Sequence, residues 1–150
     1  MHHLHRPAWT VVTTLVLALL LPLVAQARST ERIYPAQDAV DGPYGQDYLL
    51  DVPFALKGAP GAPSGKKLST VRTDQTSSGA LRSDEKACHI AFLTALKRLQ
   101  QRTRESGGDA IVDIVSVTRG ERTESPTDFR CVAGAVVVHV GLEGTVIETD

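Results

Sequence analysis

Two cysteines and two histidines beyond the N-terminal region carry the side chains best suited to redox or metal chemistry. Cys88 and His89 are adjacent, and Cys131 and His139 follow later in the chain. Thiolates and imidazoles bind copper and zinc, and a thiolate near the start of a helix is stabilised as a nucleophile. A thiol-redox or metal site that uses these four residues, or a weaker metal site of His89 and His139, is therefore one hypothesis.

The same cysteines have a structural interpretation, which their spacing favours. A thiol-disulfide oxidoreductase is expected to carry Cys-x-x-Cys, which this sequence lacks. Two cysteines in an oxidising compartment usually pair with each other. A disulfide between Cys88 and Cys131 closes a loop of about 43 residues and stabilises the fold by roughly 3–4 kcal/mol. Beside such a disulfide, His89 and His139 are interpreted as structural residues.

The N-terminal residues indicate the compartment. Arg6 is followed by an uncharged apolar stretch, a helix-breaking Pro22 and the sequence AQA that ends at Ala27. This order is typical of a secretory signal peptide over residues 1–27, cleaved between Ala27 and Arg28. The uncharged stretch is also just long enough to span a bilayer, so retention as a membrane anchor is the alternative.

Charge and motifs exclude several classes of function. Removal of the signal segment takes away one basic residue and no acidic one, so the formal charge moves from −1 to −2 and gives no reason to expect nucleic acid. The string nearest to a nucleotide-binding loop is PGAPSGKK, where Pro60 and Lys67 replace an essential glycine and hydroxyl residue. Asp109, Asp113 and Asp128 form no local pair, and G-x-S-x-G is absent. The sequence therefore predicts no enzyme activity, no ATP binding and no cofactor.

One helix and four strands are predicted around the cysteines. Ser83 is a good N-cap with acidic residues after it, and Gly107-Gly108 ends the helix. Between them, apolar residues recur on one face: Cys88, Ala91, Phe92, Ala95, Leu96 and Leu99. Strands are predicted over residues 52–56, 68–73, 110–118 and 129–142. The order ββαββ predicts an α+β fold, an antiparallel sheet with one amphipathic helix packed on one face.

The mature chain is expected to have two parts. Residues 28–51 form an extended arm with a short strand near Ile33, and residues 52–150 form the α+β domain. The arm carries Tyr34, Tyr44 and Tyr48. Because tyrosine is favoured at interfaces, the arm either docks a partner or folds back over an edge of the sheet.

The second half of the chain also carries a family pattern. The quoted residues are SDEKACHIAFLTALKRLQQRTRESGGDAIVDIVSV, then a polar loop, then FRCVAGAVVVHVGLEGTV. They resemble a family of small exported proteobacterial proteins, many labelled "excinuclease ATPase subunit". The alanine-rich helix, G-x-D/N-A-[IV]-V and Cys-x-x-Gly-x-[AV] are more remotely similar to the Rcs stress-sensing outer-membrane lipoprotein and to the YbjQ-like fold. The resemblance implies a periplasmic protein in which Cys131 is a disulfide cysteine.

The departures from these families limit what the resemblance implies. The Rcs sensor has a lipid-anchored cysteine and two disulfides, whereas this chain has no such cysteine near Ala27 and at most one disulfide. Signalling is therefore not transferred. The excinuclease label is rejected because the phosphate-binding motif and closely spaced zinc ligands are both absent.

A non-catalytic periplasmic protein is the function that the sequence predicts. Its expected role is that of a protein-interaction or envelope-associated module, with an envelope protein or a second copy bound through the edges of the sheet. Membrane contact is expected only through the transient signal peptide. Basic residues of the helix are interpreted as a solvated face, with contact to anionic envelope components as the alternative: Lys86, Lys97, Arg98, Arg102 and Arg104.

Overall fold

The computed structural model describes residues 29–150, which form one six-stranded sheet with a long helix on one side. The elements in chain order are β1 (Ser29–Pro35), α1 (Ala36–Asp41), β2 (Phe54–Leu56), β3 (Gly65–Ser78), α2 (Asp84–Glu105), β4 (Ala110–Ser116), the 3₁₀ turn η2 (Thr118–Gly120), β5 (Asp128–Gly134) and β6 (Val137–Thr149). The predicted signal peptide and its cleavage site at Ala27 and Arg28 lie outside the described residues. No helix in the described part of the chain is long and apolar enough to cross a membrane.

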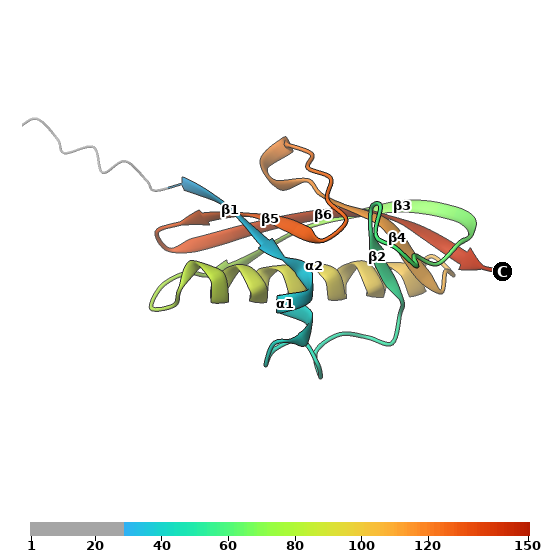
Figure 1. Cartoon of the computed structure of the whole chain (residues 1–150), viewed down its shortest axis with the longest axis horizontal. Coiled ribbons are helices and arrows are strands. Elements are labelled where there is room, and N and C mark those ends of the chain that lie inside the picture. The colour runs from blue at the N-terminus through green and yellow to red at the C-terminus, as the bar shows by residue number, and fades with distance from the viewer. Residues whose placement is uncertain (1–28) are drawn as a thin grey trace, which may run out of the picture.

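Strand β6 is the centre of the sheet (Figure 1). It pairs with β3 along one side, and on the other side with β5 near its start and β4 towards its end. β1 extends the sheet beyond β5, and β2 extends it beyond β4. Strands β1, β2 and β3 are therefore the edge strands of the described sheet.

The predicted α+β class is confirmed, with one main helix on an antiparallel-dominated sheet. Two details of the strand prediction are wrong. The stretch 129–142 is two strands, β5 and β6, joined by a tight turn at Ala135 and Val136. This turn contains no Pro, Asn or Asp, so the continuous run of apolar residues concealed it. The sheet is also not wholly antiparallel, because β2 runs parallel to β4.

The expected extended arm contains the short strand predicted near Ile33 and further regular structure. β1 pairs antiparallel with β5 from Ser29 opposite Gly134 to Pro35 opposite Asp128, and the short helix α1 follows. Further along, the buried Gln100 side chain bonds the backbone of Leu50 and Val52 at 2.8–2.9 Å. One buried amide therefore fixes the path of the chain into β2.

Helix α2 begins and ends where the sequence predicts. The Ser83 hydroxyl accepts a hydrogen bond from the Lys86 amide at 3.2 Å, which satisfies one of the first unpaired donors of the helix. Gly107 adopts a φ of +73°, a conformation that glycine allows at low cost, and the chain leaves the helix there. All six predicted apolar residues of this helix are buried against the sheet.

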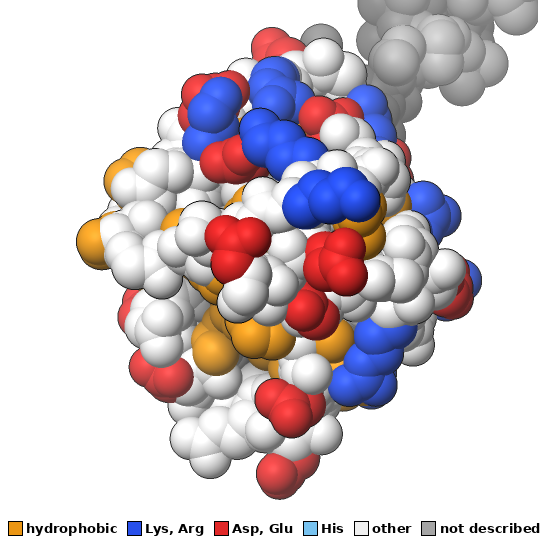
Figure 2. All heavy atoms as spheres, turned by 90° about the vertical axis from the view of Figure 1, so that its right-hand side faces the viewer, with side chains coloured by type: hydrophobic (Ala, Val, Ile, Leu, Met, Phe, Trp, Pro, Cys, Tyr) orange, Lys and Arg blue, Asp and Glu red, His pale blue; other side chains and the backbone are white. Residues whose placement is uncertain are grey.

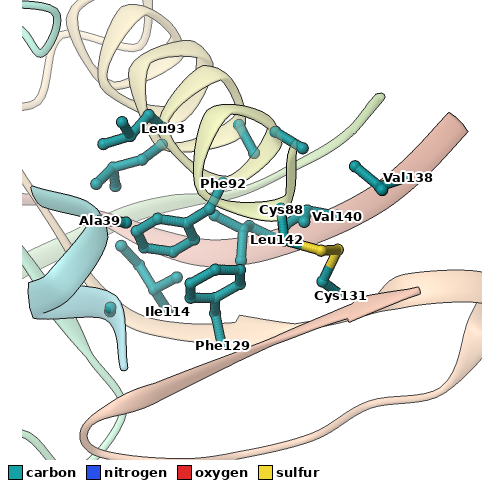
Figure 3. Packing of buried hydrophobic residues seen from close by; sticks show 14 of the residues in the cluster. Ala39, Cys88, Phe92, Leu93, Ile114, Phe129, Cys131, Val138, Val140 and Leu142 are labelled. Atoms are coloured by element: carbon teal, nitrogen blue, oxygen red, sulfur yellow. A yellow bond between two sulfur atoms is a disulfide. The ribbon is translucent and has the colours of Figure 1, made fainter. Parts of the chain in front are cut away.

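The hydrophobic core lies between α2 and the sheet (Figure 3). Phe92 of α2 stacks on Phe129 of β5, with ring centroids 4.2 Å apart. β6 contributes alternate side chains, Val138, Val140 and Leu142, to the same layer. This period of two places the side chains between them on the opposite face of the sheet.

The opposite face is covered by the connection between β4 and β5, which Figure 1 shows on the other side of the sheet from α2. The connection approaches β6 closely at Gly141, where an added Cβ would lie 2.7 Å from the Val117 carbonyl oxygen. The Gly141 amide donates to the Thr118 hydroxyl at 3.0 Å. Figure 2 shows Lys, Arg, Asp and Glu side chains interleaved over the upper part of one end of the molecule, above a hydrophobic area.

Candidate functional site

The two cysteines form the Cys88–Cys131 disulfide, with Cα atoms 5.9 Å apart. It joins the first turns of α2 to β5, and both residues are fully buried in the core (Figure 3). A thiolate that attacks a disulfide must reach its sulfur atoms. Because the core covers this disulfide, the arrangement favours a structural link between helix and sheet over exchange chemistry.

His89 lies beside the disulfide but belongs to an aromatic cluster. Its ring packs edge-on against Tyr34 with centroids 5.6 Å apart, and it also contacts Phe129 at 6.1 Å. Its Nε2 has no hydrogen-bond partner among the described residues. The ring lines an open hollow of about 290 Å³ together with Ser83 and Lys86, among others.

The four residues of the metal and thiol hypothesis do not converge. Cys88, Cys131 and His89 lie on the α2 side of the sheet, whereas His139 alternates with Val138 and Val140 of the core and so lies on the opposite face. Within residues 29–150, no three His, Cys, Asp or Glu side chains are grouped so that they could hold a metal ion.

The three aspartates considered as possible acids each have a local structural role or position. Asp109 accepts from the Thr149 amide at 2.9 Å and from its hydroxyl at 2.8 Å, which joins the start of β4 to the end of β6. Asp128 accepts from Ser125 and Thr127 hydroxyls at 3.2 and 2.9 Å. Asp113 has a φ of +52° at the irregularity where the pairing of β4 with β6 shifts.

A buried arginine on the face opposite α2 was missed by the sequence reasoning. The side chain of Arg130 is only 6% exposed, although it lies in an apolar strand. Its Nη1 donates to the Thr118 carbonyl at 2.8 Å, its Nε lies 2.8 Å from Glu31 in an ion pair, and its Nη2 bonds Glu121. The lone charge within the apolar run FRCVAG was the available signal, because buried charges require partners.

This arginine joins three parts of the chain. Glu31 comes from β1, Glu121 follows η2, and Arg130 itself lies in β5. The hydrogen bond from Arg130 lowers the pKa of Glu31, and the same contact raises the pKa of Arg130. The cluster therefore fixes the β4–β5 connection and the edge strand β1 to the sheet.

A second, more exposed ion network holds the same connection at its far end. Arg122 lies 2.6 Å from Glu143 of β6 and 3.3 Å from Glu124, and Lys57 lies 2.8 Å from Glu124. The hydrogen bond to Glu143 is the main cause of a raised pKa at Arg122, and the bond from Lys57 lowers the pKa of Glu124.

Two tyrosines of the predicted arm, Tyr44 and Tyr48, contact part of the basic helix face. The ammonium group of Lys97 lies 4.1 Å from the centroid of the Tyr48 ring, and that of Lys86 lies 5.3 Å from the Tyr44 ring. These are cation–π contacts. The two tyrosines therefore fold back on α2 rather than over an edge of the sheet.

A hollow of about 400 Å³ lies beside the edge strand β2. The Ile111 amide donates to the Pro53 carbonyl, and the Lys57 amide donates to the Ile114 carbonyl, both at 3.0 Å. Because backbone groups alternate in direction along a strand, the amides of Phe54 and Leu56 point away from β4. No charged side chain lines this hollow, which offers apolar contact and a short strand edge.

The edge of β3 is much longer. The Gly79 amide donates to the Val136 carbonyl at 2.7 Å, and the pair of Thr73 and Leu142 belongs to the same register. From Ser69 to Ser78, odd-numbered residues of β3 therefore bond β6, and even-numbered residues direct their amides and carbonyls outward. The outward groups belong to Thr70, Arg72, Asp74, Thr76 and Ser78. This row is the most extensive set of outward backbone donors and acceptors on the described sheet.

Comparison with known proteins gives no relative: no family model, no curated protein and no solved structure matches the chain. Three features of residues 29–150 bear on its function instead. These features are the buried disulfide, the buried arginine cluster and the edge strands.

Proposed function

We propose that this protein is a non-catalytic periplasmic module that binds another protein through an edge of its sheet. The single observation that carries the proposal is the outward row of backbone groups on β3. An exposed edge of this kind accepts an additional strand, because each unpaired amide and carbonyl gains a partner.

The chemistry-bearing residues give independent support. Cys88 and Cys131 are joined and buried, His139 lies on the other face of the sheet from His89, and Asp109 and Asp128 accept local hydrogen bonds. Each of these side chains has a position that a stable scaffold explains. None of them meets another in the pairing of nucleophile and base that catalysis requires.

The proposal includes export of the protein to the periplasm. The signal-peptide pattern of residues 1–27 supports delivery to a compartment in which a disulfide persists. The family resemblance supports the periplasm as that compartment. Neither the excinuclease label nor Rcs signalling is part of the proposal, because the residues that those activities need are absent from the sequence.

Photo-crosslinking in living cells tests the interaction. A photoreactive amino acid is placed at Thr76 on the β3 edge or at Ile33 on β1, with Glu85 on the exposed side of α2 as the matched control. We expect a discrete crosslinked product from an edge position and none from Glu85. No crosslinked product from either edge would contradict the proposal.

The alternative is a metal or thiol function that uses Cys88, His89, Cys131 and His139. A thiol assay distinguishes this function from the binding module. A binding module predicts cysteines that resist alkylation until they are reduced. The alternative predicts thiols that alkylate directly and a protein that takes up stoichiometric copper or zinc.

A further inference from the structure

The β3 edge has a charge pattern that complements itself. Arg72 and Asp74 project on the face opposite α2, 46% and 63% exposed, and their side chains lie 3.4 Å apart. Val71 between Thr70 and Arg72 packs against the core, which confirms the alternation of faces. A strand that presents a positive and a negative charge two residues apart can pair antiparallel with an identical strand.

One register satisfies both the backbone and the charges. Thr73 lies opposite its own counterpart on the two-fold axis, so Arg72 of each copy faces Asp74 of the other. Arg72 and Asp74 are both even-numbered residues with outward amides and carbonyls, as a hydrogen-bonded antiparallel pair requires. In the same register Thr70 faces Thr76, and β-branched pairs of this kind stabilise sheets.

The remaining charges of β3 do not oppose this register. Lys66 and Lys67 lie beyond the register shift of β3 between Lys67 and Ser69, towards the residues that follow Ser78 in the other copy, so no two lysines face each other. The one outward carbonyl already in use is that of Arg72, which accepts from Arg102 at 2.7 Å. A carbonyl oxygen has two lone pairs, and the second is available to a strand partner.

From this geometry we infer that the partner at the β3 edge is a second copy of the chain, joined in a two-fold dimer with Arg72 opposite Asp74. This inference rests on the proposed function and names its partner. Two β3 strands then join two sheets into one continuous sheet, with both α2 helices on the same face. Four charges at the centre, two from each copy, alternate in sign along and across the strands.

Sedimentation velocity of the protein purified from the periplasm tests the register with charge variants. Arg72→Asp and Asp74→Arg each place like charges opposite one another, so we expect each to weaken the dimer roughly tenfold or more. The double variant R72D/D74R restores opposite charges and is expected to dimerise like the unchanged protein. A mixture of the two single variants is expected to form a heterodimer, because the two negative charges of one variant then face the two positive charges of the other.

Two controls separate loss of association from loss of folding. Every variant is checked by circular dichroism and by resistance of its cysteines to alkylation, since Arg72 also donates to the Val117 carbonyl at 3.0 Å. Thr76→Pro removes an outward amide that β6 does not use and is expected to abolish the dimer, whereas Thr76→Ala is expected to keep it.

The outcomes also distinguish this inference from the proposed function. An unchanged protein that stays monomeric at every concentration, or single charge variants that dimerise as tightly as it does, would overturn the dimer. If Thr76 then still crosslinks to a different envelope protein, the proposed function stands and only the identity of the partner is wrong. If neither a dimer nor an edge crosslink forms, both fail.

Discussion

The two faces of the sheet are held together by different forces. On the α2 side, stacked aromatic rings, aliphatic side chains and the Cys88–Cys131 disulfide form an apolar core. On the other side, the β4–β5 connection is held by Arg130, Arg122 and their carboxylate partners. Hydrophobic burial depends little on pH and salt, whereas exposed ion pairs depend on both. Most of the stability is therefore expected from the α2 face, and the pH and salt response from the other.

The largest effect is expected from a cavity on the α2 side. Phe92→Ala removes a fully buried ring stacked on Phe129 and should lower the free energy of unfolding by about 3–5 kcal/mol. Urea unfolding measures it. The control Leu81→Ala, at a fully exposed side chain, should change stability by less than about 0.5 kcal/mol. Equal effects of the two substitutions would show that the core is misplaced.

Loss of the disulfide is expected to have the next largest effect on the free energy of unfolding. Replacement of both Cys88 and Cys131 by Ala releases a loop with a sequence separation of 43 and should lower the free energy of unfolding by about 3–4 kcal/mol. The thermal midpoint of the double variant measures this, with reduced and unreduced unchanged protein as references. A variant as stable as the oxidised protein would remove the structural role of the disulfide.

On the opposite face, Arg130 is expected to contribute more than Arg122. Arg130→Met removes one of the two donors to the buried Thr118 carbonyl and the cation that pairs with Glu31 and Glu121, and it should lower the free energy of unfolding by about 2 kcal/mol. Arg122→Met, at a side chain 48% exposed and screened by solvent, should lower it by less than Arg130→Met does. Urea unfolding of the two variants side by side gives the comparison, and the reverse order would contradict it.

The smallest effect is the pH response of the ion pairs. The pKa of Glu31 and that of Glu124 are lowered from the ordinary value of 4.5, so their contribution is complete above 4.5 and is lost as the pH falls through the lowered values. Unfolding measured at decreasing pH should show this loss, and added salt should reduce it. The Glu31→Gln variant should lack the part of this pH-dependent loss of stability that comes from Glu31. An identical pH profile in that variant would exclude the Arg130 pair as its cause.

Sequence patterns were most informative where a single local signal decided the structure. Ser83, the apolar spacing up to Leu99 and Gly107 fixed the bounds of α2, because capping and periodicity are local properties. The pairing of Cys88 with Cys131 followed from there being only two cysteines in the chain. These elements placed the disulfide between helix and sheet correctly.

Other features depend on contacts between distant parts of the chain. The turn at Val136 lies in a continuous apolar run, so alternation alone could not divide β5 from β6. The short strand predicted near Ile33 extends over Ser29–Pro35 because it pairs with β5. Arg130 can be buried because Glu31 and Glu121, from other parts of the chain, pair with its charge. Which amides and carbonyls of β3 point outward likewise depends on the register between β3 and β6, and the sequence does not show that register.

Mass measurement of the intact protein recovered from the periplasm tests the central claim most directly. That claim is an exported module whose cysteines stabilise the fold and perform no chemistry. The account predicts a chain that starts at Arg28 and takes up no alkylating reagent until it is reduced, after which both cysteines react. A protein whose cysteines alkylate without reduction would contradict the account, and metal binding at Cys88, His89, Cys131 and His139 would then be the question to pursue.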